Sequence, residues 1–193
     1  MGSGAKPRPF DRDRICKALT HSETSSPHDK ASPQSVTDLR DYRTALGSFG
    51  TGVAIATTCD AQGQPAGLTI NSFSSVSLTP PMVLWSLSKT SSKYAAFQSG
   101  SHFCINILQK DQLPLAMQFS RHADDKFLNI AWEAGLGGAP KILGALATFE
   151  CRNTVHYEGG DHTIFLGEVE AYAHHQGEPL LFHRGSFGGF LLS

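Results

Sequence analysis

The chain has 193 residues, of which 40% are hydrophobic and 17% are charged, enough for one domain of ordinary size with a real core. Its 16 basic and 17 acidic side chains give a formal net charge of -1, which excludes the strong positive field that nucleic-acid binding needs. No segment has the apolar length of a membrane span, so we expect no membrane partner.

The first 35 residues are rich in Ser, Pro and charged side chains and poor in large apolar groups. Such a segment cannot bury enough surface to offset chain entropy, so residues 1–35 are predicted to be a disordered extension. The folded domain is then predicted to span residues 36–193. It begins with a helix that Thr37 or Asp38 caps and that ends at the glycines Gly50 and Gly52. Apolar residues recur in it at helical spacing, namely Leu39, Tyr42, Ala45, Leu46 and Phe49.

The rest of the domain is predicted to be mainly β. A strand over 53–58, a turn over 60–64 and a return strand over 65–70 form a hairpin. Six or seven closely spaced strands with peripheral helices indicate a small closed barrel, not a βαβ array. The other strands are predicted over 82–87, 102–108, 147–157, 163–172 and 179–182, and short helices over 92–99 and 112–119.

Within 147–157 the alternation predicts that Phe149, Cys151, Val155 and Tyr157 share one face. The four cysteines of the chain are widely spaced and form no CxxC pair, so Cys151 is expected to be a small buried side chain. Neither the cysteines nor the histidines have metal-ligand spacing, and we expect no metal site. The N-terminus lacks the apolar region of a signal peptide, so we expect a cytoplasmic protein.

The most informative segment is residues 67–81, GLTINSFSSVSLTPP, which carries hydroxyls and an amide where a core strand would carry Val or Leu. Such a row of short polar side chains suits a surface that hydrogen-bonds a flat ligand rich in heteroatoms, and we favour a flavin. The alternative is a solvated edge strand that turns at Pro80 and Pro81.

A second polar cluster, residues 86–93 (SLSKTSSK), closes a predicted strand and opens a helix. Backbone N–H groups at a helix N-terminus, together with hydroxyls and lysines, can bind a phosphate. The alternative is simple helix capping with exposed lysines. Together, the two clusters could hold the ring and the phosphate tail of one ligand.

Two further segments place a histidine beside a turn. The first is Gly160-Asp161-His162, before the strand over 163–172, and the second is His183-Arg184-Gly185. His162 could donate a hydrogen bond to a ligand, and Arg184 could pair with a phosphate or a carboxylate. Each could equally be a structural residue that stabilises its own turn. The chain has no GxGxxG motif, P-loop or GxSxG elbow, so Rossmann, Walker and serine-hydrolase chemistry are not supported.

These motifs, in this order, resemble the short-chain flavin reductases, the small reductase components of two-component flavin-dependent monooxygenases. The resemblance covers residues 38–190. It implies a Greek-key-like split β-barrel that binds FMN or FAD, forms a homodimer and uses NADH or NADPH. The segments that carry it are 49–53, 67–73, 78–81, 103–108, 160–162 and 179–185.

By position, the resemblance makes His162 the catalytic residue and places it on the nicotinamide side. Relatives often carry Arg where this chain has Gln118, and Lys126 could supply the missing charge. The implied flavin-binding residues are Gly67, Leu68, Thr69, Asn71, Ser72, Ser86, Leu87, Ser88, Ser92, Lys93, Gln118 and Phe119. The implied nicotinamide-binding residues are His162, Phe182, His183, Arg184 and Gly185.

The implied activity is hydride transfer from a nicotinamide cofactor to FMN or FAD, in an NAD(P)H:flavin oxidoreductase that supplies a partner monooxygenase with reduced flavin. Three alternatives remain at this point. The same barrel could be a non-catalytic flavin-binding or electron-carrier protein, or a pyridoxal-type phosphate oxidase. It could also be an interaction module whose polar clusters are all solvated.

Overall fold

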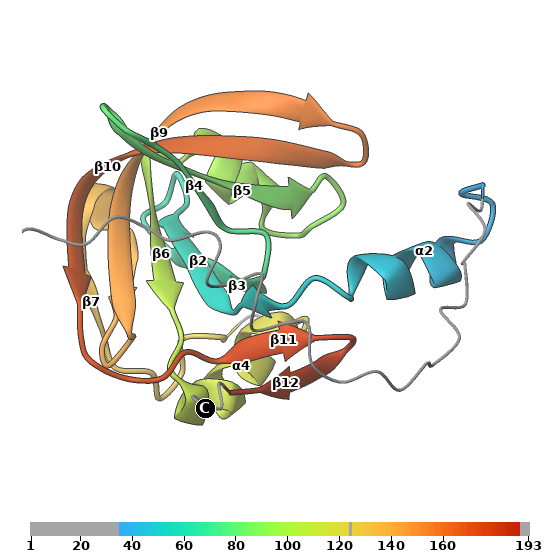
Figure 1. Ribbon diagram of the computed structural model, residues 1–193. Coiled ribbons are helices and arrows are strands. Elements are labelled where there is room, and N and C mark those ends of the chain that lie inside the picture. The colour runs from blue at the N-terminus through green and yellow to red at the C-terminus, as the bar shows by residue number, and fades with distance from the viewer. Residues whose placement is uncertain (1–34, 124, 190–193) are drawn as a thin grey trace, which may run out of the picture. The chain divides into compact units, whose positions relative to one another are not determined.

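The computed structural model describes residues 35–123 and 125–189 (Figure 1). Within these ranges, the residues from Asp38 onward form one compact unit. All of the predicted N-terminal extension except its last residue lies outside the described residues.

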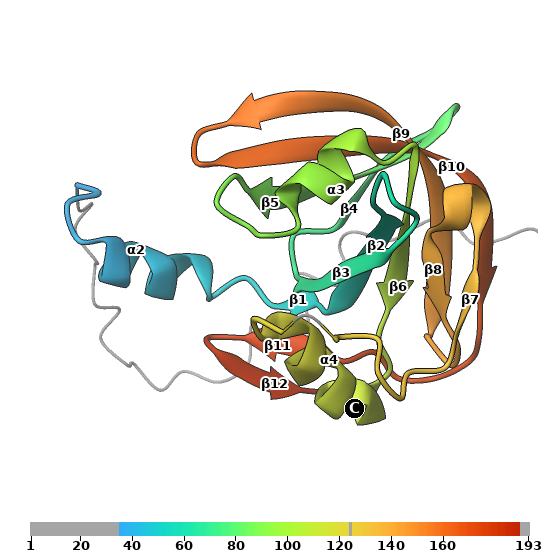
Figure 2. The ribbon, with the colours of Figure 1, turned by 180° about the vertical axis from the view of Figure 1, so that it is seen from behind.

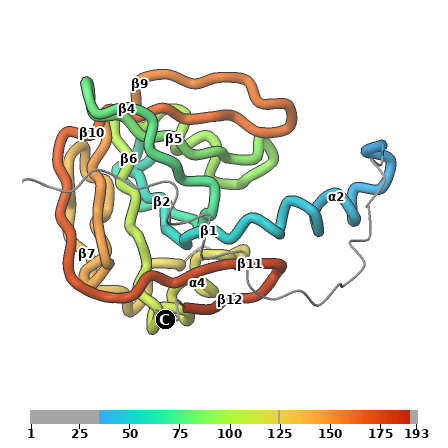
Figure 3. Tube along the Cα trace, viewed as in Figure 1, coloured from blue at the N-terminus to red at the C-terminus, as the bar shows by residue number. Residues whose placement is uncertain are grey.

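An antiparallel sheet of seven strands forms the body of this unit and confirms the predicted mainly β, split-barrel architecture. The Cα trace in Figure 3 shows how the long β9–β10 hairpin bends around the other strands. Across the sheet the order is β3 (Pro65–Ile70), β2 (Ala54–Cys59), β6 (His102–Ile107), β9 (Ala147–Gly159), β10 (His162–His174), β5 (Pro81–Ser88) and β4 (Ser74–Leu78).

Smaller helices and strands surround this sheet, and several of them were not among the elements predicted from the sequence. Among the described residues, α4 packs against β3 and β2, and α3 packs against β2, as the view from behind shows (Figure 2). The helices are α2 (Leu39–Leu46), α3 (Tyr94–Ser99) and α4 (Leu113–Ser120), with short 3-10 turns η1 (Lys110–Gln112) and η2 (Leu136–Gly138). The remaining strands are β1 (Thr51–Gly52), β11 (Leu181–His183) and β12 (Ser186–Gly188) in one sheet, and β7 (Trp132–Ala134) and β8 (Pro140–Ile142) in another.

Strand β2 is buried on both faces, which explains its continuous apolar sequence. Ala54 and Ala56 point into the barrel core with Trp85, Phe103 and Phe165. The side chain between them, Ile55, points the other way, into a second core that α4 and β8 cover. That second core contains Val53, Ile55, Leu108, Ala116, Phe119, Ile142 and Leu180.

The polar segment 67–81 contains two strands with different environments. Residues Pro65–Ile70 form β3, which is mostly buried or half-buried, whereas Ser74–Leu78 form β4 at the edge of the sheet. Side chains of β4 are mainly exposed, and Leu78 is 91% exposed. The edge-strand interpretation is therefore correct for 74–78, and the ligand interpretation can apply only to the residues before it.

A side chain bridges β5 and the segment that follows β3. The Ser72 hydroxyl accepts a hydrogen bond from the Ser86 N–H at 3.0 Å and donates one to the Ser86 carbonyl at 3.2 Å. The Ser72 side chain therefore satisfies both backbone groups of Ser86, as a neighbouring strand would, and joins the two segments.

The predicted common face in 147–157 is wrong. Cys151 is fully buried, as expected, but Val155 is 41% and Tyr157 is 55% exposed. The pairing with β10 explains the difference, because Asn153 lies opposite Gly167 while Val155 already lies opposite Leu166. The extra residue, Thr154, is a β-bulge that reverses the facing of the strand beyond it.

The first helix is shorter than predicted and is not covered within the described chain. The Asp38 side chain caps α2 by accepting hydrogen bonds from the backbone N–H of Arg40 and Asp41, and Gly47 ends the helix. None of its residues is buried. Apolar side chains of this segment remain exposed, including Leu39, Leu46 and Phe49.

Candidate functional site

The two polar clusters and the Asp-His turn meet at one hollow between β3 and β5, which we call the β3–β5 hollow. Its volume is about 480 Å³, within the ordinary range of small-molecule sites. The segments 68–72, 86–91 and 159–162 are far apart in the sequence and converge here because β5 pairs with the start of β10. The lining residues are Leu68, Thr69, Ile70, Asn71, Ser72, Ser86, Leu87, Ser88, Ser91, Gly159 and His162.

Several hydroxyl groups of this hollow already form hydrogen bonds within the protein. Thr69 donates to the Ala116 carbonyl at 2.7 Å, and Ser72 bridges to Ser86 as described. The Ser88 hydroxyl lies 2.9 Å from that of Thr90. In contrast, Asn71 is exposed, and its amide forms no hydrogen bond with any residue in the described part of the chain. Asn71 is therefore the side chain best able to bind a ligand edge here.

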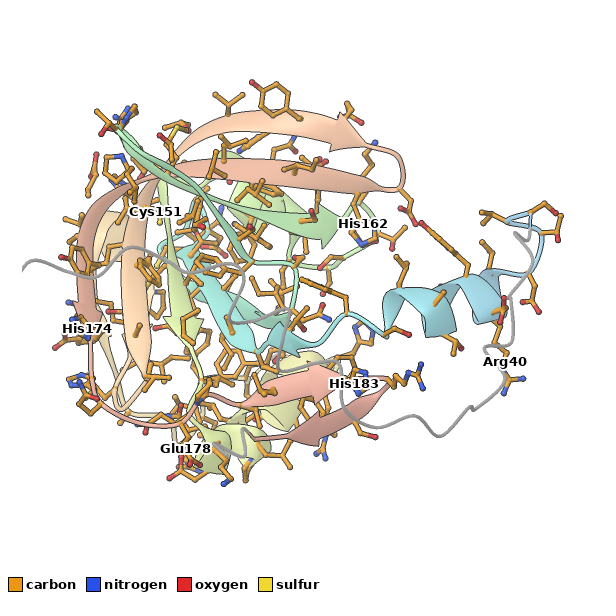
Figure 4. All side chains as sticks on the ribbon, in the orientation of Figure 1. Arg40, Cys151, His162, His174, Glu178 and His183 are labelled. Atoms are coloured by element: carbon orange, nitrogen blue, oxygen red, sulfur yellow. The ribbon has the colours of Figure 1, made fainter. Side chains whose placement is uncertain are left out.

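His162 lies at the rim of the hollow, at the start of β10 (Figure 4). Its Nδ1 is 2.8 Å from a carboxylate oxygen of Asp161, so Nε2 is the ring nitrogen left for a ligand. This hydrogen bond, aided by the charge of His162, lowers the pKa of the Asp161 carboxyl.

Lys89 holds the same turn from the end of β5. Its ammonium group forms an ion pair with Glu158 and donates to the Gly160 carbonyl at 2.8 Å, while its backbone N–H donates to the Asp161 backbone carbonyl at 3.0 Å. Hydrogen bonding to Glu158 raises the pKa of Lys89. The turn that carries His162 is thus fixed to β5, which itself lines the hollow.

The structure places Gly67 and Phe119 behind the hollow and not in its wall. Phe119 is fully buried and packs edge to face on Phe127, so it cannot contact a ligand in this conformation. A Cβ atom on Gly67 would lie 2.9 Å from the Phe119 ring, which explains the glycine at this point of β3. Both residues position the strand, and the flavin contact of Phe119 that the resemblance implies stays a prediction.

Ser92 and Lys93 line an adjoining hollow of about 720 Å³, the α3 hollow, between the β2–β3 turn and α3. They follow Ser91 directly, so a ligand in the β3–β5 hollow could extend to them. Gln118 lines a different surface hollow, and its amide donates to the carbonyls of Lys126 and Leu128. Gln118 therefore supports the loop that contains Lys126 and Leu128.

Lys126 is a charged residue held in a buried position. It is 8% exposed, and its ammonium group donates to the carbonyls of Phe119 at 2.8 Å and Gly67 at 3.3 Å. Burial lowers the pKa of Lys126, and the nearby positive charge of Lys93 lowers it further. An anion bound beside the two lysines would relieve this repulsion.

The predicted nicotinamide residues are divided between two places. His162 lines the β3–β5 hollow, whereas Phe182, Arg184 and Gly185 line a separate groove beside α2. His183 is exposed and lines none of these hollows (Figure 4). The predicted site residues did not include Ile70, Ser91 and Gly159, although Ile70 and Ser91 lie within the singled-out segments and Gly159 adjoins one.

The described residues contain neither a membrane-spanning helix nor a metal-binding cluster. No helix in 35–123 and 125–189 is long and apolar enough to cross a membrane. Within the same ranges, no three His, Cys, Asp or Glu side chains group in a way that could hold a metal ion.

Comparison with known proteins identifies the family. Residues 46–190 match the profile of the flavin reductase like domain. The chain is 48% identical over 151 residues to the FMN reductase (NADH) SmoA of Agrobacterium fabrum. This match covers 78% of this chain and 86% of that protein. It is 41% identical to the reductase component of the flavin-dependent trigonelline monooxygenase of Acinetobacter baylyi, over 79% of this chain and only 49% of that protein.

A solved structure agrees with these sequence matches. The NADH:FAD oxidoreductase SgcE6 of Streptomyces globisporus, in complex with NAD and FAD fragments, superposes with a TM-score of 0.79. It is 38% identical in sequence, and the match covers 83% of this chain and 98% of that one. The resemblance predicted from the sequence is confirmed, and the chain belongs to the flavin reductase-like family.

Proposed function

We propose that this protein is an NADH-dependent flavin reductase that transfers hydride to FMN and supplies a separate monooxygenase with reduced flavin. The observation that carries the proposal is the convergence of 68–72, 86–91 and 159–162 on the β3–β5 hollow, with His162 at its rim. The relative at 48% identity is an FMN reductase that uses NADH, and the relative from Acinetobacter is a monooxygenase reductase component.

The residues of the hollow fit a flavin. A planar ring needs a flat, narrow space with a few polar groups at its edge, and the hollow offers the Asn71 amide and the Nε2 of His162. Toward the phosphate end, Ser92 and Lys93 lie next along the chain, and the charge of Lys93 is close enough to lower the pKa of the buried Lys126. An anionic tail there would be favourable because it offsets the repulsion between the two lysines.

When bound, the flavin accepts the hydride and the nicotinamide donates it, so no protein nucleophile is needed. The protein must hold the two rings about 3–3.5 Å apart and aligned. Asn71 would donate a hydrogen bond to the flavin edge, and this bond would strengthen as negative charge develops on the ring. His162, held by Asp161, would orient the nicotinamide through Nε2.

Three finer points belong to this proposal. FMN is preferred over FAD, and NADH over NADPH, because the relative at 48% identity is an FMN reductase that uses NADH. The active form is a homodimer, which exposed apolar side chains such as Leu46, Phe49 and Leu78 support. Residues 36–193 act as one domain.

The proposal also places the protein in the cytoplasm, where a reducing environment keeps cysteines as free thiols. Cys59, Cys104 and Cys151 are free thiols in the described chain. Burial raises the pKa of Cys104 far above its usual value and that of Cys151 to about 12, so both thiols stay protonated and inert.

The deciding experiment follows the oxidation of NADH and NADPH under anaerobic conditions with FMN, FAD and riboflavin as acceptors. We expect rapid bleaching of the flavin absorbance with NADH and FMN. Flavin binding without bleaching would indicate the non-catalytic carrier instead, and the absence of flavin binding would indicate an interaction module.

A further inference from the structure

The outer half of the β9–β10 hairpin carries His162 and has few neighbours. Strand β6 pairs with β9 only as far as Arg152, and residues 155–159 of β9 pair with β10 alone in the described chain. All of residues 155–159 are exposed. Figures 1 and 2 show the turn at the outer end of the hairpin, away from β6. A side chain on such a projection keeps a fixed position only if the turn is tied to the rest of the domain.

One residue of the neighbouring strand ties this turn down. Lys89 follows β5 directly, and its backbone N–H donates to the Asp161 carbonyl at 3.0 Å. Its ammonium group donates to the Gly160 carbonyl at 2.8 Å. The same ammonium group forms an ion pair with Glu158, on the strand that leads into the turn. Lys89 therefore holds both residues at the tip of the hairpin and the strand before them.

No other contact of this kind holds the turn. His162 pairs with Ser88 at the end of β5, which Figure 4 shows beside it. Apart from this strand pairing, the hydrogen bonds that join 158–161 to segments outside the hairpin, within 35–123 and 125–189, all end on Lys89. Loss of the Lys89 side chain would free Gly160 and Glu158. A small rotation of the turn would then move His162, because it directly follows the tip.

Lys89 itself stands apart from the ligand space. It is not among the residues that line the β3–β5 hollow or the α3 hollow, although Ser88 and Ser91 line the first and Lys93 lines the second. The Lys89 side chain is 37% exposed and that of Glu158 is 77% exposed, so their ion pair contributes little to stability. An effect of Lys89 on activity can therefore be separated from an effect on folding or on ligand contact.

We infer that Lys89 is a positioning residue for hydride transfer, which holds Gly160 and Glu158 so that His162 faces the nicotinamide. This inference rests on the proposed function and adds a residue outside the set that lines the site. Lys89 touches neither ring and acts through His162. Hydride transfer depends on close alignment of the two rings, so a shift of His162 slows the reaction even when both ligands are bound.

A double-mutant cycle on the rate of flavin reduction tests the inference. Lys89→Met removes the ammonium group and keeps an unbranched side chain. With FMN bound, oxygen excluded and NADH saturating, Lys89→Met should reduce FMN about ten-fold more slowly than the parent. In a His162→Ala background the same change should have no further effect, because Lys89 acts through His162. Lys89→Arg keeps the charge and the donors, so its rate should stay within about two-fold of the parent rate.

Lys110→Met is the matched control. Lys110 is also an exposed lysine paired with a glutamate, Glu178, but it lines none of the hollows described above, so the rate should not change. The FMN affinity of Lys89→Met should equal that of the parent. Its melting temperature should differ by less than about 4 °C, because an exposed ion pair stabilises the fold only slightly.

An unchanged rate in Lys89→Met would overturn the inference. A rate that falls by the same factor in the His162→Ala background would also overturn it, since Lys89 would then act independently of His162. Weaker binding of FMN with unchanged binding of riboflavin would overturn it as well and make Lys89 a phosphate ligand. If the parent protein reduces no flavin with NADH, the proposed function itself fails, and the inference fails with it.

Discussion

Replacing Ser72 with alanine tests whether a side chain holds the barrel together at the site. The change removes two hydrogen bonds to Ser86, one accepted from its N–H and one donated to its carbonyl. Each contributes about 0.5–1.5 kcal/mol to stability. Because Ser72 and Ser86 are half-buried, water can replace part of the lost hydrogen bonding. We therefore expect the free energy of unfolding to fall by about 1–2 kcal/mol. In a domain of this size that lowers the melting temperature by roughly 2–8 °C.

Urea denaturation followed by tryptophan fluorescence measures this loss, because Trp85 is fully buried in the barrel core. Ser74→Ala is the matched control: Ser74 is exposed on β4, and its hydroxyl bonds only to the neighbouring Ser75 carbonyl in the described structure, at 3.2 Å. The control should change the unfolding free energy by less than about 0.5 kcal/mol. An equally small change in Ser72→Ala would show that the bridge does not stabilise the barrel.

Four other substitutions test the rest of the site. His162→Ala should lower NADH-dependent flavin reduction ten-fold or more, about 1.4 kcal/mol, with FMN affinity kept; an unchanged rate removes His162 from the mechanism. Asn71→Ala should weaken FMN binding in a fluorescence titration by about ten-fold, and equal affinity would refute its role. Gly67→Ala should cost about 1–3 kcal/mol in urea denaturation, because the new Cβ meets the buried Phe119 ring; a stable variant would mean that the ring moves freely. Asp161→Asn removes a carboxyl whose pKa is lowered, so its stabilisation is present above the usual carboxyl pKa and is lost as pH falls through the lowered one; the stability gap between variant and parent should close in acid.

Much of the fold could be predicted because local pattern and tertiary environment agree. The hairpin over residues 53–70 is the clearest case, since a buried strand, a turn and a return strand follow one another. In contrast, the predicted facing of Val155 and Tyr157 failed because the bulge at Thr154 has no local sequence signal. Strands of two or three residues, such as β1 and β12, were missed because their pairing partners lie elsewhere in the chain.

The site was predicted as a set of segments but not as a geometry. The sequence showed that 68–72, 86–91 and 160–162 are unusually polar, and the structure brings them together. It could not show which hydroxyls are already used, because that depends on carbonyls such as Ala116 on α4. The groove beside α2 could not be predicted for a related reason, since its walls come from α2 and from residues 182–185 at the other end of the chain.

We propose that the polar row has two functions that composition alone cannot separate. Thr69 and Ser72 use their hydroxyls to fix β3 and the following segment to α4 and β5, beside the β3–β5 hollow that both residues line. In the proposed function, recognition of the flavin is then left to Asn71 and to the shape of the hollow, which would meet only the ring common to FMN and FAD, while His162 orients the nicotinamide. We therefore expect the choice between the two flavins to depend on what the α3 hollow offers beyond Ser92 and Lys93, and substitutions there should change flavin preference without changing the hydride-transfer step.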